Sequence, residues 1–139
     1  MNEDYSLKDP FSLAGKRFLI TGGTLGIGRA ISLQFARSGT TVLANYVRDE
    51  KAAKALKEEA DAAGLTIETC RADLTSEKGM ERLDTFLKNH GDVLSGLVHC
   101  AATGVHKPYA ELTGWHFDWM LGLNVCAFME LVKMLVPRF

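Results

Sequence analysis

A glycine-rich turn at positions 21–28 carries the residues best suited to binding chemistry in this chain. It reads Thr-Gly-Gly-Thr-Leu-Gly-Ile-Gly and joins a short apolar run, 17–20, to a helical pattern. Gly22 allows a tight turn, Gly26 lets backbone approach a pyrophosphate, and Gly28 lets the helix pack against a sheet. A helix that begins there directs free N–H groups and the positive end of its dipole at phosphates. An ordinary loop is the alternative, but the strand before and the helix after favour a dinucleotide site.

The end of a second apolar run, 41–46, bears on which dinucleotide the turn would hold. NAD-preferring domains of this kind carry an acidic residue there, which binds the ribose hydroxyls and repels a 2′-phosphate. Here the chain has neutral Asn45, followed by Tyr46 and then Arg48. A guanidinium forms charge-assisted hydrogen bonds with phosphate. The pattern therefore favours NADP(H) over NAD(H), and an Arg48 that only lies on a solvated surface is the alternative.

Alternating strand and helix patterns must position these residues. Four apolar runs at 17–20, 41–46, 65–70 and 97–100 alternate with helical patterns at 28–37, 49–63, 76–89 and 115–135. The alternation predicts an α/β fold, a Rossmann-type doubly wound parallel sheet that is incomplete, with strand order 3-2-1-4 and no C-terminal strands. We expect a polar lead-in at 1–15 and a partial NAD(P)-binding Rossmann domain at 16–139. The fourth strand would then be an edge with unpaired backbone groups.

The composition is that of an ordinary soluble globular chain. Of 139 residues, 47% are hydrophobic and 24% are charged, and the formal net charge is -1. This balance gives no electrostatic reason to expect nucleic acid or an anionic membrane as a partner. We also expect no apolar run long enough to span a bilayer, and the acidic, polar start differs from a secretory signal. A cytoplasmic location follows as the expectation.

Neither the cysteines nor the histidines form a recognisable reactive or metal-binding set. Cys70, Cys100 and Cys126 are odd in number and lack ligand spacing, so we expect buried thiols and no metal site. No histidine has the spacing of a nucleophile–base pair or of metal ligands, so packing or surface roles are expected. For His106, in the loop after the fourth strand, a place near a substrate mouth is the alternative. The histidines are His90, His99, His106 and His116.

The spacing of the turn, Thr-Gly-x-x-x-Gly-x-Gly, resembles the cofactor turn of the short-chain dehydrogenase/reductase family. The resemblance extends over nearly the whole chain. Asp73-Leu74 is similar to the family's pair beside the adenine. Positions 99–102 read His-Cys-Ala-Ala where the family usually has Asn-Asn-Ala-Gly, so His99 departs from the pattern. Asn124 matches the family's helix asparagine, which bends its helix and holds a water of the proton relay through its backbone.

The resemblance implies an NADP(H)-dependent oxidoreductase with a defined set of site residues. Asn124 would be its catalytic relay residue, although a side chain satisfied by neighbouring backbone is the alternative. The implied cofactor contacts are Gly22, Thr24, Leu25, Gly26, Ile27, Gly28, Asn45, Tyr46, Arg48, Asp73, Leu74, Cys100, Ala101 and Ala102.

A narrower resemblance concerns the segment after the fourth strand. Positions 101–105, with Pro108, Trp115 and Trp119, resemble bacterial enoyl-acyl-carrier-protein reductases of the FabL type. That resemblance implies hydride transfer to an enone or enoyl thioester. A ketone or β-ketoacyl reductase of the same family is an alternative, and so is a non-catalytic NADP(H)-binding or regulatory protein.

The family's proton donor is a tyrosine whose pKa is lowered by a nearby lysine, both on a helix after a fifth strand. These 139 residues contain no such strand, and Tyr5, Tyr46 and Tyr109 lack the lysine and strand context. We therefore expect residues 1–139 alone to bind NADP(H) weakly, to catalyse nothing by the usual route, and to be unstable or oligomeric.

The last predicted helix, 115–135, is apolar on more than one side. A helix that is apolar nearly all round is expected to be buried on all sides. In the resembled family this helix forms subunit interfaces, which implies a homo-oligomer; docking onto a full-length homologue is the alternative. The substrate implied by the resemblance is a small molecule or an acyl thioester.

Overall fold

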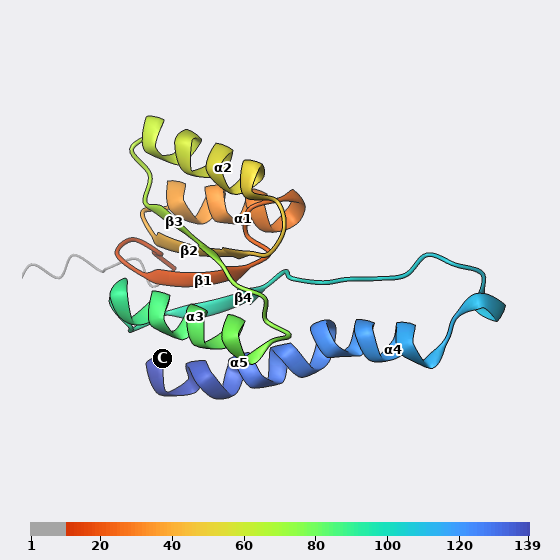
Figure 1. Ribbon diagram of the computed structural model, residues 1–139. Helices are drawn as coiled ribbons and strands as arrows, with labels where there is room; N and C mark the ends of the chain where they lie inside the picture. Colours follow the sequence, from red (N-terminus) through yellow and green to blue (C-terminus); the bar gives the residue numbers. More distant parts are fainter. Residues whose placement is uncertain (1–10) are drawn as a thin grey trace, which may run out of the picture.

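The chain folds into a four-stranded parallel sheet with helices on both faces (Figure 1), in a computed structural model that describes residues 11–139. Residues 1–10 of the expected lead-in lie outside the described residues. The strands are β1 Arg17–Thr21, β2 Thr41–Tyr46, β3 Ile67–Arg71 and β4 Gly96–His99. Their order is β3-β2-β1-β4, which confirms the predicted fold and topology.

The observed strand ends differ from the predicted ones where a helix closes. β3 begins at Ile67 rather than at Leu65, because the Leu65 N–H donates to the Ala60 carbonyl and so belongs to the end of the preceding helix. β4 begins one residue early, at Gly96, and ends at His99. Within the described chain β4 pairs only with β1, so it forms the edge that the sequence predicts.

Two of the three helices between the strands begin on side-chain capping residues. The three helices are α1 Gly26–Arg37, α2 Glu50–Ala62 and α3 Glu77–Asn89. The Asp49 side chain accepts a hydrogen bond from Ala52 N–H at the start of α2, and Ser76 accepts one from Gly79 N–H at the start of α3. At the other end of α1, Gly39 has a φ of +80°, a conformation in which glycine is the natural residue.

Alternating side chains of each strand feed two separate cores, one on each face of the sheet. Leu19 of β1 points to the face covered by α3 and the last helix, whereas its neighbour Ile20 points to the face covered by α1 and α2. In β2, Leu43 and Val42 divide in the same way. Burial on both faces explains why these strands read as continuous apolar runs.

The last helix is continuous in extent but not in type. It comprises α4 Gly114–Leu121, a π-helical turn at Gly122–Ala127, and α5 Phe128–Leu135, and it ends in a 3-10 turn at Val136–Arg138. A further 3-10 turn, Tyr109–Glu111, lies at the tip of the long loop that leads to α4. Pro137 lies in the closing 3-10 turn.

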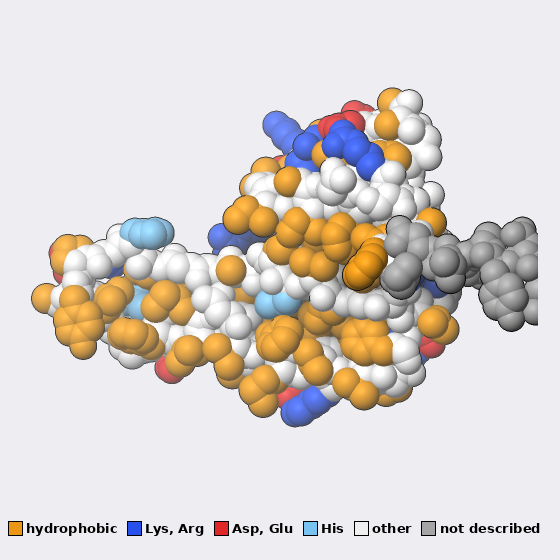
Figure 2. All heavy atoms as spheres, turned by 180° about the vertical axis from the view of Figure 1, so that it is seen from behind, with side chains coloured by type: hydrophobic (Ala, Val, Ile, Leu, Met, Phe, Trp, Pro, Cys, Tyr) orange, Lys and Arg blue, Asp and Glu red, His pale blue; other side chains and the backbone are white. Residues whose placement is uncertain are grey.

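The prediction that this helix is buried on all sides is wrong. Leu131 and Leu135 of α5 are fully buried against α3 and the sheet, but α4 projects beyond the sheet with its loop (Figure 1). Figure 2 shows hydrophobic side chains along this projecting arm and along the adjoining face. The exposed ones on the helix are Trp115, Phe117, Leu121, Val125, Phe128 and Met129. They are exposed because no described element packs against that side.

The expectation that no apolar run is long enough to span a bilayer is also wrong. The helix Gly114–Arg138 has 25 residues and meets the requirements of length and composition for a membrane span. Core helices of soluble proteins meet the same requirements, and here α5 packs against the sheet through Leu131 and Leu135.

Candidate functional site

The glycine turn folds back on the first turn of α1. Gly22 has a φ of +61°, and a Cβ there would lie 3.0 Å from the Ala101 nitrogen, so the turn contacts the end of β4 directly. A Cβ on Gly28 would lie 2.1 Å from the Gly22 carbonyl oxygen. The absence of a side chain at Gly28 therefore lets the turn pack against α1. The sequence analysis predicted instead that it lets α1 pack against the sheet. Gly26 has open space around its missing Cβ, which leaves the backbone accessible to a ligand.

Ser32 holds the turn from within α1, a role that the sequence pattern did not indicate. Its hydroxyl donates to the Gly23 carbonyl at 2.9 Å and is buried. The Gly23 N–H donates in turn to the Asn45 carbonyl of β2 at 3.0 Å. The turn is thus tied to both α1 and β2 before any ligand binds.

A buried threonine joins the turn to the end of β4. Thr21 Oγ1 accepts a hydrogen bond from the Ala101 N–H at 3.2 Å and lies 2.9 Å from His99 Nδ1. The His99 ring packs against Phe128 of α5, with ring centroids 5.1 Å apart. Burial lowers the pKa of His99, and its Nε2 is buried without a hydrogen-bond partner among the described residues. His99 therefore has the packing role predicted for it, with one hydrogen bond added.

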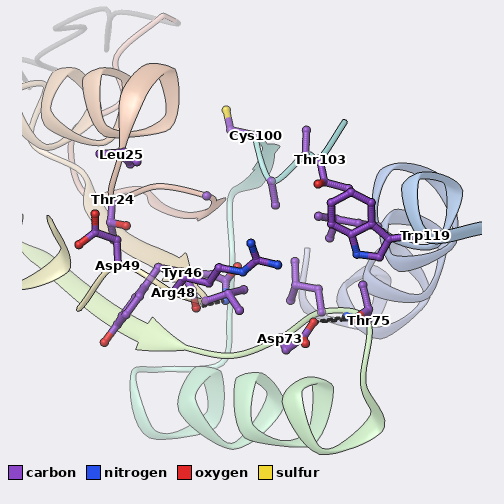
Figure 3. A pocket seen from close by; sticks show the side chains of 17 residues that line it. Thr24, Leu25, Tyr46, Arg48, Asp49, Asp73, Thr75, Cys100, Thr103 and Trp119 are labelled. Carbon is purple, nitrogen blue, oxygen red and sulfur yellow. Dashed lines mark hydrogen bonds between the residues drawn. The ribbon is translucent and has the colours of Figure 1, made fainter. Parts of the chain in front are cut away.

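The end of β2 presents two residues with different roles. Asn45 is fully buried, and its Nδ2 donates to the Ala72 carbonyl at 2.9 Å, while its Oδ1 has no partner among the described residues. Arg48 is exposed, and Figure 3 shows its side chain reaching into the cavity. Within residues 11–139 no carboxylate forms a salt bridge with Arg48. Arg48 is thus the residue here that is able to meet an incoming anion.

Asp73 lies across the cavity with its carboxylate already engaged. Its Oδ1 accepts hydrogen bonds from the Thr75 hydroxyl at 2.7 Å and from the Thr75 N–H at 2.9 Å. These bonds, and to a smaller extent the Arg48 charge, hold the pKa of Asp73 below its usual value. Gly79 allows the loop that carries Asp73 to pack directly against the start of α3, because a Cβ at Gly79 would lie 1.8 Å from the Asp73 carbonyl oxygen. A glycine inside a helix is the sequence signal that marks such an approach.

These segments enclose a cavity of about 380 Å³ at the carboxyl ends of the strands (Figure 3). Its walls contain most of the predicted cofactor residues: Gly22, Thr24, Leu25, Asn45, Tyr46, Arg48, Asp73, Leu74, Cys100, Ala101 and Ala102. Its remaining lining residues were not predicted: Val47, Asp49, Thr75, Thr103, Trp119 and Leu123. Gly26, Ile27 and Gly28 do not line it, although they belong to the same turn. The carboxyl ends of parallel strands are where folds of this type bind ligands.

Asn124 lies in the π-helical turn, outside the cavity wall. Its Oδ1 accepts from the Thr103 N–H and its Nδ2 donates to the Thr103 carbonyl, both at 2.9 Å. The side chain is therefore satisfied by neighbouring backbone, which is the alternative raised from the sequence, and it fixes the loop after β4. A water held by the Asn124 backbone stays a prediction.

Two of the remaining histidines have structural contacts, whereas the place of His106 near a substrate mouth stays a prediction. His90 bonds the Phe86 carbonyl, and His116 caps α4 through Thr113. Burial raises the pKa of the Cys70 thiol to about 11, but Cys126 is exposed, so the expectation of buried thiols is wrong there. Cys126 faces the side of the π-helical turn that no described element covers. Among residues 11–139 there is no cluster of three or more metal-binding side chains.

Comparison with known proteins assigns this architecture. Residues 16–139 match the family model described as short chain dehydrogenase. A hydroxynaphthalene reductase-like protein Arp2 of Metarhizium brunneum is 34% identical over 122 residues, covering 88% of this chain and 46% of the relative. The 7alpha-hydroxysteroid dehydrogenase of Escherichia coli is 31% identical over 130 residues, which are 94% of this chain and 50% of that protein. The chain thus spans about half the length of the curated relatives it matches.

Solved structures agree with this comparison. The Pseudomonas aeruginosa RhlG/NADP active-site complex superposes with a TM-score of 0.83 at 30% identity, covering 92% of this chain and 49% of that one. A 7 alpha-hydroxysteroid dehydrogenase complexed with NADH and 7-oxo glycochenodeoxycholic acid has a TM-score of 0.83 at 31% identity, covering 91% and 49%. Structures with either nicotinamide cofactor are therefore similar to this chain.

Proposed function

The chain belongs to the short-chain dehydrogenase family, and from this membership we propose that its cavity binds NADP(H) for hydride transfer to a ketone. The observation that carries the proposal is the combined wall of the cavity, where the glycine turn, a neutral β2 end and an arginine without a salt bridge among the described residues meet. Hydride chemistry belongs to the cofactor, and the protein supplies binding and orientation.

The residues present fit a dinucleotide. The open space at Gly26 leaves the start of α1 accessible, and no acidic residue stands in its first turn to repel a pyrophosphate. The buried, unpartnered Asn45 Oδ1 is an acceptor at the wall of the same cavity. Both carboxylates of the wall are held by hydrogen bonds, Asp49 to the Ala52 N–H and Asp73 to Thr75.

Arg48 supports NADP(H) over NAD(H). It is the basic side chain of the cavity wall and forms no salt bridge within the described residues, so it is free to bind a 2′-phosphate. The similar structures do not decide the matter, since one carries NADP and another NADH. The proposal rests on the charge of this wall.

In this proposal each residue acts by position. The start of α1 binds the pyrophosphate, Arg48 binds the 2′-phosphate, and Ser32 and Thr21 keep the turn in place. Asn124 fixes the loop after β4 through Thr103. The family's tyrosine–lysine pair is not among these 139 residues, and so we propose that residues 1–139 alone bind cofactor without turnover.

A ketone substrate is favoured by the names of two similar proteins, a hydroxynaphthalene reductase and a hydroxysteroid dehydrogenase. An enone or enoyl-thioester substrate rests only on the FabL-type resemblance of the loop after β4. A panel of ketones, β-ketoacyl thioesters and enoyl thioesters, tested on the protein at its natural length, separates these activities. NADPH binding without turnover of any of them would support a non-catalytic role instead.

The exposed apolar side of α4 and α5 supports self-association, and we propose a homo-oligomer formed through this helix. The cytoplasmic location and the lack of nucleic-acid and membrane partners stay predictions from composition.

The cofactor proposal is tested by titrating the protein at its natural length with NADPH and NADH, using calorimetry. We expect NADPH to bind at least about tenfold more tightly, because a charge-assisted pair contributes about 1.5–3 kcal/mol. Arg48→Gln should remove the difference, and Arg37→Gln, which changes an exposed arginine of α1 that does not line the cavity, should keep it. Equal affinities in the wild type would contradict the proposal.

A further inference from the structure

The cavity has an aromatic wall that comes from the projecting arm of the molecule. Trp119 of α4 lines the cavity together with Leu123 and Thr103, and its indole is half-buried. Figure 3 shows Trp119 at the end of the cavity away from Thr24 and Leu25 of the glycine turn. A large indole that is half-exposed inside a cavity presents a flat apolar surface to whatever binds there.

The opposite wall at this end is cationic. Figure 3 shows the Arg48 side chain reaching across the cavity from the end of β2, on the side facing Trp119. Leu74 and Asp73 line the same cavity. A flat, uncharged aromatic ring fits between an indole and a guanidinium, because both surfaces stack favourably on such a ring.

The residues at the two ends of the cavity indicate which part of a bound dinucleotide would lie beside Trp119. The glycine turn holds the phosphates at one end, and Arg48 meets the 2′-phosphate on the adenosine ribose. The ring attached to that ribose is adenine, so adenine is the group that extends toward Trp119. We propose that Trp119 stacks on the adenine base and is a binding residue for the adenosine end of the dinucleotide; this rests on the proposed function.

Trp115 offers a matched control on the same helix. Its ring is parallel to that of Trp119, at an interplanar angle of 2° with centroids 6.0 Å apart. It is 67% exposed and does not line the cavity. The two tryptophans thus share a helix face and differ in their access to the ligand.

The test compares Trp119→Leu with Trp115→Leu in the protein at its natural length. The probe is 2′-phospho-ADP-ribose, which carries the base and the phosphates but no nicotinamide, and binding is followed by calorimetry and tryptophan fluorescence. Base–aromatic stacking is lost in Trp119→Leu, so its Kd should rise about tenfold or more and the ligand-induced quenching should disappear. Trp115→Leu should keep both within about twofold of wild type.

Two further measurements separate stacking from general damage. Trp119→Phe, which keeps an aromatic ring, should recover most of the affinity, and reduced nicotinamide mononucleotide, which lacks adenine, should bind Trp119→Leu as it binds wild type. An unchanged Kd for 2′-phospho-ADP-ribose in Trp119→Leu overturns the inference, and so does an equal loss for the mononucleotide. If wild type binds neither NADPH nor this probe, the proposed function fails as well, which is a distinct result.

Discussion

The two halves of the last helix are similarly apolar, yet one is buried and the other is exposed. In α5, Leu131 and Leu135 are fully buried in the core beneath β4 and α3. In α4, Trp115 and Leu121 are exposed at 67% and 51%. The difference lies in the surroundings, since α3 and the sheet cover α5 and no described element covers α4. An apolar helix therefore shows that a partner surface is needed, and the fold decides where that surface is.

The polar contacts of α4 and α5 differ in the same way as their burial. At the end of α5, Arg138 donates to Asp84 of α3, to Asp92 and to the Met134 carbonyl, and the Arg138 side chain is only 10% exposed. At the start of α4 the polar contacts are local, between Thr113 and His116. The π-helical turn lies between the halves, where Asn124 is bonded to Thr103. One half is thus fixed to the body, and the other depends on what the cavity or a partner supplies.

The largest expected difference between the halves concerns stability. Leu131→Ala should lower the free energy of unfolding by about 2–5 kcal/mol, because it leaves a cavity in a closed core. Leu121→Ala, an equal truncation on the exposed half, should change it by less than about 1 kcal/mol. Urea denaturation of the protein at its natural length measures both. Equal losses would mean that a partner element buries α4 as fully as α3 buries α5.

The sequence was sufficient to predict what depends on local order. The alternating strands and helices, the caps Asp49 and Ser76 and the glycine turn all leave short-range signals, and the sheet order follows from them. Gly79, a glycine within a helix, is a further local signal, and it marks the close approach of the Asp73 loop. Local patterns therefore predicted the elements and the glycine turn, and the resemblance to the family implied most of the cavity wall.

What the sequence could not predict are contacts between residues far apart in the chain. Ser32 and Thr21 hold the turn through partners that no spacing reveals. Trp119 contributes to the FabL-type resemblance, but no sequence pattern places it at the cofactor, and only the path of the arm brings it to the cavity. The burial of the last helix was overestimated for the same reason, because periodicity describes a helix and not its neighbours.

A smaller effect is expected from the ion pairs that hold α5. Arg138→Met should destabilise the protein by about 1–2 kcal/mol, since it removes charged hydrogen bonds at a largely buried guanidinium but leaves Asp92 half in solvent. Lys133→Met breaks the solvent-exposed pair with Glu130 and should cost less than about 0.5 kcal/mol. Thermal unfolding of the two variants side by side provides the measurement. A Lys133 variant as unstable as the Arg138 variant would contradict the inference that the Arg138 ion pairs fix α5 to the rest of the fold.

Acid should weaken the ion pairs that Asp84 forms with Lys88 and Arg138. The pKa of Asp84 is lowered, first by the hydrogen bond to Lys88 and then by the bond to Arg138. A carboxyl with a lowered folded-state pKa contributes stability above its unfolded value of about 3.9, and that contribution is lost as the pH falls through the folded value. Asp84→Asn should therefore flatten the stability profile below about pH 4.

The smallest effect concerns His99, which packs on α5 through Phe128. Burial lowers its pKa, so the folded state resists a proton that the unfolded chain accepts near pH 6.5. Because the unfolded state then binds more protons, stability should fall as the pH drops below about 6.5 toward the folded-state pKa. Unfolding free energies at pH 7.5 and pH 5.5, in wild type and His99→Asn, isolate this contribution from that of the other histidines. The variant should lose less stability between the two pH values than wild type does. An equal loss of stability in wild type and in His99→Asn would show that His99 is protonated in the folded state. The surroundings of His99 and α5 would then be more open to solvent than the packing against Phe128 indicates.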